Sequence, residues 1–131
     1  MKLNWFAIII GIVLTAVLAI FGFYVGLIAV IAPIIAGIII GYAYTDNTGD
    51  GAINAGIGAG IGGLIYTILA FYAALSVVTA ITYFTAGSYV PTGANLAVTA
   101  IGALIIDFIL GAIGGVIGVL LKGESSAKPA A

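Results

Sequence analysis

Long apolar stretches run through almost the whole of this 131-residue chain and favour membrane-spanning helices over any other fold. Hydrophobic residues make up 64% of the sequence and charged residues 5%, whereas a soluble domain carries roughly 25% charged residues. A stretch of about 18 apolar residues or more is typical of a transmembrane helix. Lipid contains no water to hydrogen-bond the backbone, and a helix satisfies its backbone groups internally. We therefore expect an all-α membrane protein, a four-helix transmembrane bundle with glycine-mediated helix packing.

The remaining composition excludes several classes of function. A net charge of −1 provides no basic surface for phosphate groups, so we expect no nucleic acid partner. The sequence contains no Cys and no His, which excludes disulfides, thiolate chemistry and the usual zinc sites. It also has no paired carboxylates at membrane depth and no Ser beside a base, so we expect no enzymatic activity and no cofactor.

Interfacial aromatic residues divide the first apolar block into two crossings. Aromatic side chains prefer the two membrane–water interfaces, and they recur here at Trp5, Tyr24 and Tyr42. This spacing of about 18 residues is roughly 27 Å of helix, close to a hydrocarbon core of about 30 Å. The first turn is therefore expected near residues 23–27, with Pro33 as a kink in the second helix. The alternative places the turn at Pro33 itself.

Polar segments separate the later helices. The four helices are predicted at about residues 4–23, 27–44, 52–85 and 95–121, in one transmembrane domain over residues 1–122. The polar segment before the third helix is a turn by composition, and Asp50 is expected to be the N-cap of that helix. Residues 123–131 are expected to form a disordered tail. The first helix is expected to stay uncleaved, because no polar mature start follows it.

The third predicted helix is too long for one upright crossing. Residues 52–85 would reach roughly 50 Å as a helix, so they must tilt, project from the bilayer or break. Residues 76–85 are rich in β-branched and aromatic residues, which leaves a small extramembrane hairpin as an alternative. A long or kinked helix is favoured, because unpaired strands in lipid leave backbone groups without partners. A loop is expected at residues 86–94.

The distribution of Lys predicts the orientation of the chain. Lys2 lies near one terminus, Lys122 and Lys128 lie near the other, and no loop contains Lys or Arg. Basic residues near helix ends are retained in the cytoplasm, so both termini are expected there. Two cytoplasmic termini require an even number of crossings, and four crossings satisfy this. The protein is therefore expected to be a multi-pass protein of the cell membrane.

Small residues at helical spacing predict how the helices pack. Lipid tails are as apolar as Leu, so helices associate where small residues permit close approach of their backbones. The third helix carries one such stripe and the fourth helix carries another, which includes Ala100, Ala103 and Asp107. The residues expected to make packing contacts are Gly37, Gly41, Gly56, Gly60, Gly63, Gly111, Gly114 and Gly118.

Asp107 is the one charged residue inside a long apolar stretch. A carboxyl group at bilayer depth is costly, so it usually faces protein or a cavity and often marks function. Because Asp107 lies on the small-residue stripe, we expect it to be buried against another helix. No Lys or Arg lies at its depth, so the expected partners are the hydroxyl groups of Thr67, Tyr66 and Thr15. Desolvation favours the neutral acid, which would then donate a hydrogen bond.

Two resemblances accompany these patterns. Residues 36–42 (Ala-Gly-Ile-Ile-Ile-Gly-Tyr), the polar turn and residues 51–56 (Gly-Ala-Ile-Asn-Ala-Gly) resemble a family of small, Gly-rich archaeal membrane proteins of unknown function with four predicted crossings. That resemblance covers roughly residues 4–70 and implies a membrane location without an activity. The glycine run of residues 56–63 together with Asp107 also resembles rotary ATPase proteolipid subunits, but the polar basic loop of those subunits is missing here.

Two hypotheses of function follow. The first is a non-enzymatic structural or accessory role, in which glycine stripes exposed beyond those used internally mediate association with a second copy or another membrane protein. The second is a proton or ion channel or carrier centred on Asp107. In both cases the lipid bilayer is the surrounding partner.

Overall fold

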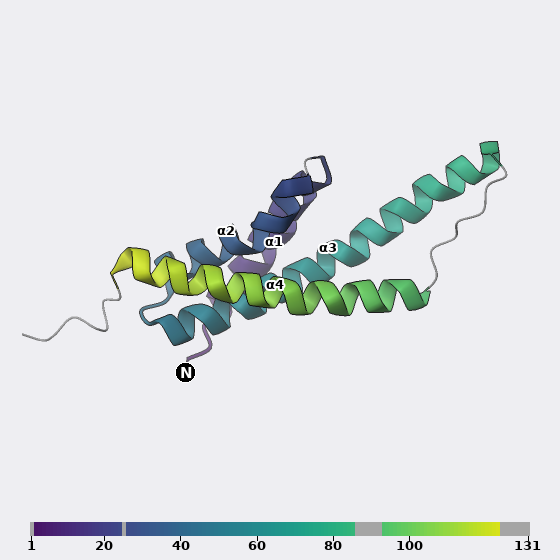
Figure 1. Cartoon of the computed structure of the whole chain (residues 1–131). Helices are drawn as coiled ribbons and strands as arrows, with labels where there is room; N and C mark the ends of the chain where they lie inside the picture. Colours follow the sequence, from purple (N-terminus) through teal and green to yellow (C-terminus); the bar gives the residue numbers. More distant parts are fainter. Residues whose placement is uncertain (1, 25, 86–92, 124–131) are drawn as a thin grey trace, which may run out of the picture.

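The structure, a computed structural model, describes residues 2–24, 26–85 and 93–123, and these residues are almost entirely helical (Figure 1). The helices are α1 (Trp5–Tyr24), α2 (Gly26–Tyr44), α3 (Thr48–Thr85) and α4 (Gly93–Lys122). No strand occurs in the described ranges, so the expected all-α, four-helix bundle is confirmed. The alternative of a hairpin at residues 76–85 is wrong, because α3 continues through them.

The helix ends lie close to the polar and glycine-rich positions of the sequence. The first turn falls between Tyr24 and Gly26, and Pro33 lies inside α2, so the alternative turn at Pro33 is wrong. α3 begins at Thr48 rather than at residue 52, and α4 begins at Gly93 rather than at residue 95. The rest of the predicted loop, residues 86–92, and most of the predicted tail, residues 124–131, lie outside the described residues.

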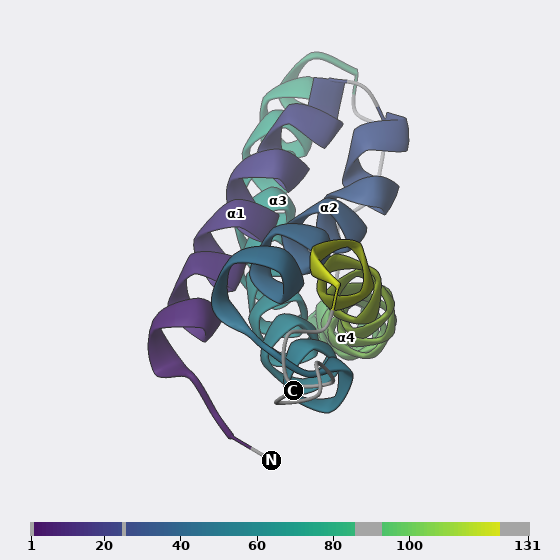
Figure 2. The same ribbon diagram turned by 90° about the vertical axis from the view of Figure 1, so that its left-hand side faces the viewer.

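α2 and α3 each contact all the other helices of the bundle. α3 and α4 share the largest contact, α2 packs against α4, and α1 packs against α2 and α3. α1 and α4 barely touch, because α2 and α3 lie between them (Figure 2). The first residues of the chain, the turn between α2 and α3, and the end of α4 lie at one end of the bundle, which we call the terminal end (Figure 1). α3 extends far beyond the α1–α2 hairpin in the opposite direction.

Three helices are long and apolar enough to cross a membrane. The spans are Trp5–Gly22, Thr48–Tyr72 and Ala97–Lys122, and α2 contributes the shorter apolar segment Val30–Tyr44 among the residues that the structure describes. α2 nevertheless returns the chain to the level where α1 begins, since the Asn4 side-chain amide donates a hydrogen bond to the Tyr44 carbonyl. A membrane location follows from the three spans, and the crossing by α2 stays a prediction.

Small residues lie inside the bundle and bulky aliphatic residues lie outside it. The buried hydrophobic residues are mostly alanines, among them Ala7, Ala32, Ala36, Ala55 and Ala59. Large apolar side chains such as Trp5, Phe21, Val98 and Leu121 are exposed. This distribution would be unstable in water, but lipid solvates large apolar side chains while small residues permit close helix contact.

Candidate functional site

Two glycine rows on α4 face two different helices. A methyl group added at Gly111 or Gly115 would collide with the backbone of α3, coming within 2.7 Å of the Ala55 carbonyl oxygen in the first case. The same addition at Gly114 or Gly118 would collide with the backbone of α2. The fourth helix was expected to carry one stripe, but the structure divides its glycines between α3 and α2.

The remaining packing glycines also lie at contacts within the chain. Gly56 and Gly60 face Phe108 and Leu104 of α4, with an added methyl group 3.1 Å from each carbonyl oxygen. On α2, Gly37 contacts the backbone of Gly111 to Gly115, and Gly41 contacts Gly115 and Val119. The predicted packing residues are therefore used internally and do not form an exposed surface.

The carboxyl group of Asp107 lies directly against Gly63 of α3. A methyl group at position 63 would overlap the Asp107 carboxyl group and lie 3.0 Å from its Cβ atom, so any larger residue there would require the Asp107 side chain to move. Asp107 is half-buried, and none of the described residues donates a hydrogen bond to its carboxyl group or accepts one from it. The side chain thus faces protein, as expected from its stripe, without the expected hydroxyl partner.

The three expected hydroxyl partners lie elsewhere. Thr15 is fully buried between α1 and α3, where a methyl group on Gly62 would lie 2.8 Å from the Thr15 Cβ atom. Gly62 and Gly63 point about 100° apart around α3, so Thr15 and Asp107 approach that helix from different sides. Tyr66 and Thr67 are half-buried and make no hydrogen bond with Asp107. The Thr15 hydroxyl has no hydrogen-bond partner among the described residues.

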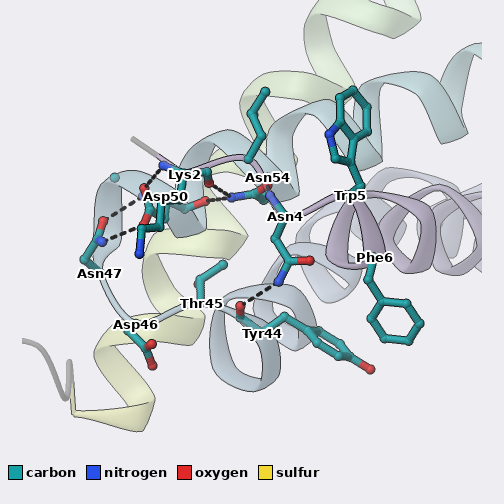
Figure 3. Close-up of a pocket in the computed structure, with 12 residues that line it drawn as sticks. Lys2, Asn4, Trp5, Phe6, Tyr44, Thr45, Asp46, Asn47, Asp50 and Asn54 are labelled. Atoms are coloured by element: carbon teal, nitrogen blue, oxygen red, sulfur yellow. Dashed lines mark hydrogen bonds between the residues drawn. The ribbon is translucent and has the colours of Figure 1, made fainter.

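A hydrogen-bonded cluster at the terminal end is a second candidate site, and Asn54 of α3 is its centre (Figure 3). Asn54 is fully buried. Its carboxamide oxygen accepts a hydrogen bond of 2.7 Å from the Asn4 backbone, and its nitrogen donates bonds of 2.9 and 2.8 Å to the carbonyl oxygens of Lys2 and Asp50. The Lys2 backbone in turn donates a bond of 2.9 Å to the Asp50 carboxylate. We call this set of four residues the N-terminal clamp.

Asn47, rather than Asp50, is the N-cap of α3. The side-chain oxygen of Asn47 accepts a hydrogen bond of 2.8 Å from the Asp50 backbone, three residues into the helix. The Asp50 carboxylate accepts a bond of 2.7 Å from the Asn47 side chain in return. The expectation that Asp50 is the cap is therefore wrong, since the helix starts earlier and places Asp50 in its first turn, where its charge suits the helix dipole.

The end of α4 is attached to the same region. The Lys122 ammonium group donates hydrogen bonds of 2.8 Å to the Thr45 carbonyl oxygen and to the Asp46 carboxylate. Gly123 then ends the helix with a φ of 91°, a left-handed conformation typical of glycine after a helix. The end of α4 is thus bonded to the turn between α2 and α3, and the start of the described chain is bonded to the helix ends on either side of that turn.

An open hollow of about 1050 Å³ lies beside the N-terminal clamp. Its lining includes Lys2, Asn4, Asp46 and Asn47, and the rings of Trp5 and Phe6 point away from the hydrogen-bonded cluster (Figure 3). No group of three His, Cys, Asp or Glu side chains that could hold a metal occurs in the part of the chain that the structure describes. The polar groups of the clamp bond mainly to one another, which indicates a structural connection between segments rather than a reactive site.

The sequence contained one signal for the clamp. Asp50 and Asn54 are four residues apart, so they lie on one face of a helix, and Asn54 is polar among small and apolar residues. That spacing identifies a polar face at the start of α3. It does not reveal the partner, because the groups that Asn54 binds are backbone atoms 50 and 52 residues away in the chain.

Together the fold and these sites define a small α-helical membrane protein whose helices pack through glycine and whose described long-range hydrogen bonds gather at one end. A family model described as a family of unknown function (DUF5518) matches residues 5–121, so the chain belongs to this family. Comparison with curated proteins finds no match, and comparison with solved structures finds none. Membership of a family of unknown function agrees with the resemblance seen in the sequence, and an archaeal origin stays a prediction.

Proposed function

We propose that this protein has a non-enzymatic structural or accessory role in the membrane and acts by association with a second copy of itself. One observation carries the proposal. Beyond Gly63, α3 has no buried residue from Leu64 to Tyr72, although the described helix continues to Thr85. A 38-residue helix is about 57 Å long, whereas the 20 residues of α1 reach only about 30 Å. A large part of α3 is therefore not covered by the α1–α2 hairpin.

A glycine on α4 that packs against no other helix of the chain supports contact with a second protein chain rather than with lipid alone. Gly102 has no neighbour within 4 Å of an added methyl group, in contrast to the packing glycines of the same helix. Large apolar side chains surround this part of α3 and α4, namely Ile65, Ile68, Leu69, Val98 and Ile101. Because close helix association in lipid depends on small residues, Gly102 is the position where another helix would approach.

Self-association is tested by native mass spectrometry after extraction in a mild detergent. We expect an oligomer for the natural chain and a shift to monomer for Gly102→Ile, because the larger side chain blocks close approach. Ala43→Ile is a matched control, since Ala43 is an exposed small residue on α2 and its replacement should leave the oligomer intact. A natural chain that is monomeric, without a protein partner on purification from its own membranes, contradicts the proposal.

We also propose the cell membrane as the location, with both termini in the cytoplasm. Lys2 and Lys122 lie at the same end of the bundle, where each bonds to the region of the α2–α3 turn. Basic residues near helix ends favour the cytoplasmic side. Reporter domains that are active only in the cytoplasm, fused to each terminus in turn, should both be active. Activity at one terminus alone contradicts the arrangement.

A proton or cation carrier centred on Asp107 is the second candidate function. It is favoured by the position of the carboxyl group, half-buried against Gly63 without a hydrogen bond to any described residue. A proton or cation flux in proteoliposomes should be lost in Asp107→Asn. Asp46→Asn is the control, because Asp46 is exposed at the terminal end and its loss should leave the flux unchanged. Absence of flux in the natural chain, or flux that persists in Asp107→Asn, removes this candidate.

A further inference from the structure

We infer that the open hollow beside the N-terminal clamp binds the headgroup of a zwitterionic phospholipid. The phosphate would lie on the Lys2 ammonium group, and a primary ammonium group of the lipid would lie on the Asp50 carboxylate. This site is separate from the surface that we assign to a second copy, because the hollow lies at the terminal end and Gly102 lies in the first half of α4. Three observations support the inference.

The first observation is that the clamp uses the backbone of Lys2 and leaves its side chain out. The Lys2 nitrogen donates a hydrogen bond of 2.9 Å to the Asp50 carboxylate, and the Lys2 carbonyl oxygen accepts one of 2.9 Å from Asn54. The side chain is exposed and makes no ion pair with a described residue, whereas Lys122 is paired with Asp46. The backbone of Lys2 is therefore held beside the hollow while its cation stays available to an anion.

The second observation is that charges of both signs line the hollow, since Lys2 and Asp50 both contribute to it. Each oxygen of the Asp50 carboxylate accepts one hydrogen bond, from the Lys2 backbone and from the Asn47 side chain, and each can accept another. A purely anionic headgroup would pair with Lys2 but would also meet the Asp50 charge. A headgroup that carries a phosphate and a primary ammonium group pairs with both, because each charge then has a partner of opposite sign.

The third observation is that the hollow extends across the expected boundary between membrane and water. Lys2 lies three residues before Trp5, where the first membrane span begins. The exposed rings of Trp5 and Phe6 point away from the polar cluster (Figure 3), and aromatic rings prefer this boundary. A lipid with its headgroup against the clamp would place its glycerol and its chains beside these rings. The volume of about 1050 Å³ is near the upper end of the roughly 300–1,000 Å³ of pockets for small molecules.

Trp5 provides the test, because it is the only tryptophan of the chain and lines the hollow. The full chain is placed in bilayers of phosphatidylcholine that contain an increasing fraction of a lipid with brominated chains. Bromine quenches tryptophan fluorescence at short range, so the quenching of Trp5 gives the affinity of each lipid relative to phosphatidylcholine. Brominated phosphatidylethanolamine, phosphatidylglycerol and phosphatidylcholine are compared. Because the bromine is on the chains, the measurement reports a bound lipid rather than a free phosphate or amine.

We expect phosphatidylethanolamine to bind roughly three- to fivefold more tightly than phosphatidylcholine, since exposed ion pairs contribute little each and a quaternary ammonium group has no hydrogen to donate. Phosphatidylglycerol, which lacks the amine, should bind less tightly than phosphatidylethanolamine.

Two variants remove the charges one at a time. Lys2→Gln should abolish the preference for phosphatidylethanolamine while the clamp stays closed, because the clamp uses only backbone atoms of Lys2. Asp50→Asn keeps an oxygen for the Lys2 backbone and should shift the preference toward phosphatidylglycerol. Lys122→Gln is the matched control, since Lys122 is a cation at the same end that does not line the hollow, and its loss should leave the preference unchanged. Circular dichroism checks that each variant is folded.

Equal binding of phosphatidylethanolamine and phosphatidylcholine, or a preference of the natural chain for phosphatidylglycerol, overturns the inference. A preference for phosphatidylethanolamine that persists in both Lys2→Gln and Asp50→Asn overturns it as well. An equal loss in Lys2→Gln and Lys122→Gln would show a general effect of surface charge and would also remove the site. The result is independent of oligomeric state, so a monomeric chain that keeps the preference would remove the proposed self-association and leave the lipid site standing.

Discussion

At the scale of single residues, the amide of Asn54 joins parts of the chain that are far apart in sequence. It bonds to backbone groups of residues 2 and 4 at the entrance to α1 and to Asp50 in the first turn of α3. Each of these bonds satisfies a backbone group at the edge of the bundle. A buried polar group without its partner costs about 1–3 kcal/mol. Because Asn54 bonds both to the segment before α1 and to the first turn of α3, loss of its amide destabilises both helices.

Replacement of Asn54 by Ala should lower the free energy of unfolding by about 2–4 kcal/mol, because the Asn4 amide and the Lys2 carbonyl lose their partner. Unfolding in a titration of denaturing detergent, followed by circular dichroism, measures this loss. Gly49→Ala lies at the same end in an exposed position and should be neutral or slightly stabilising. Equal stability of Asn54→Ala and the natural chain would show that the clamp contributes nothing.

The ion pair of Lys122 should contribute much less. Asp46 is 69% exposed, and exposed ion pairs are worth about 0–1 kcal/mol. A double-mutant cycle with Lys122→Met and Asp46→Asn should therefore give a coupling energy below about 1 kcal/mol, and that coupling should weaken with added salt. A larger coupling that is insensitive to salt would contradict this assignment.

The sequence could predict the surroundings of Asp107 only in part. Asp107 could be placed against a neighbouring helix, because its own helix carries small residues at the same spacing. Its hydroxyl partners could not be predicted, because depth in the membrane says nothing about the direction from which each helix approaches. Thr15 is at a suitable depth but lies on another side of α3, against Gly62.

At the scale of helices, α4 packs against two neighbours and carries glycine on both of the faces that contact them. Gly111 and Gly115 face α3, and Gly114 and Gly118 face α2. The sequence predicted the helix and its packing role, since four small residues in two turns permit close backbone approach. It could not say that the row divides between two neighbours, because spacing along one helix does not specify how many helices surround it.

A matched pair of glycine substitutions on α4 tests this arrangement. Gly115→Ala should lower stability by about 2 kcal/mol or more, because the methyl group meets the Gly51 backbone, which cannot give way as a side chain can. Gly102→Ala meets open space and should raise stability by up to about 1 kcal/mol through helix propensity. Thermal unfolding of both variants in a detergent that keeps the chains monomeric measures the difference, so that contact with a second copy at Gly102 does not contribute. Similar effects at the two positions would contradict the close contact at Gly115.

At the scale of the whole molecule, hydrogen bonds link the helices at one end of the bundle, and α3 and α4 diverge at the other end. The hydrogen bonds between segments distant in sequence gather at the terminal end in the part of the chain that the structure describes. Toward the other end, α3 and α4 move apart (Figure 1). The membrane-spanning helices and their approximate lengths could be predicted from the apolar stretches, but this asymmetry could not, because it depends on contacts between residues about 50 to 77 positions apart.

Amide hydrogen exchange in detergent should report the same asymmetry. Backbone amides of α3 from Gly51 to Gly63 should exchange more slowly than those from Leu64 to Tyr72, because local opening is easier where burial is low. Both segments belong to one continuous helix, so their difference cannot come from secondary structure. Uniform protection along α3 would contradict a bundle that is closed at one end only.

The N-terminal clamp also sets an order for biosynthesis. A ribosome releases residues 2–4 long before it has made Asn54, and it makes Lys122 last of the residues that bond at this end. The leading segment is therefore made without its main partner, Asn54, which follows only after α1 and α2. The third helix supplies Asp50 and Asn54, and the fourth supplies Lys122, so a chain interrupted after its second helix retains, of the described long-range bonds at this end, only the one between Asn4 and Tyr44.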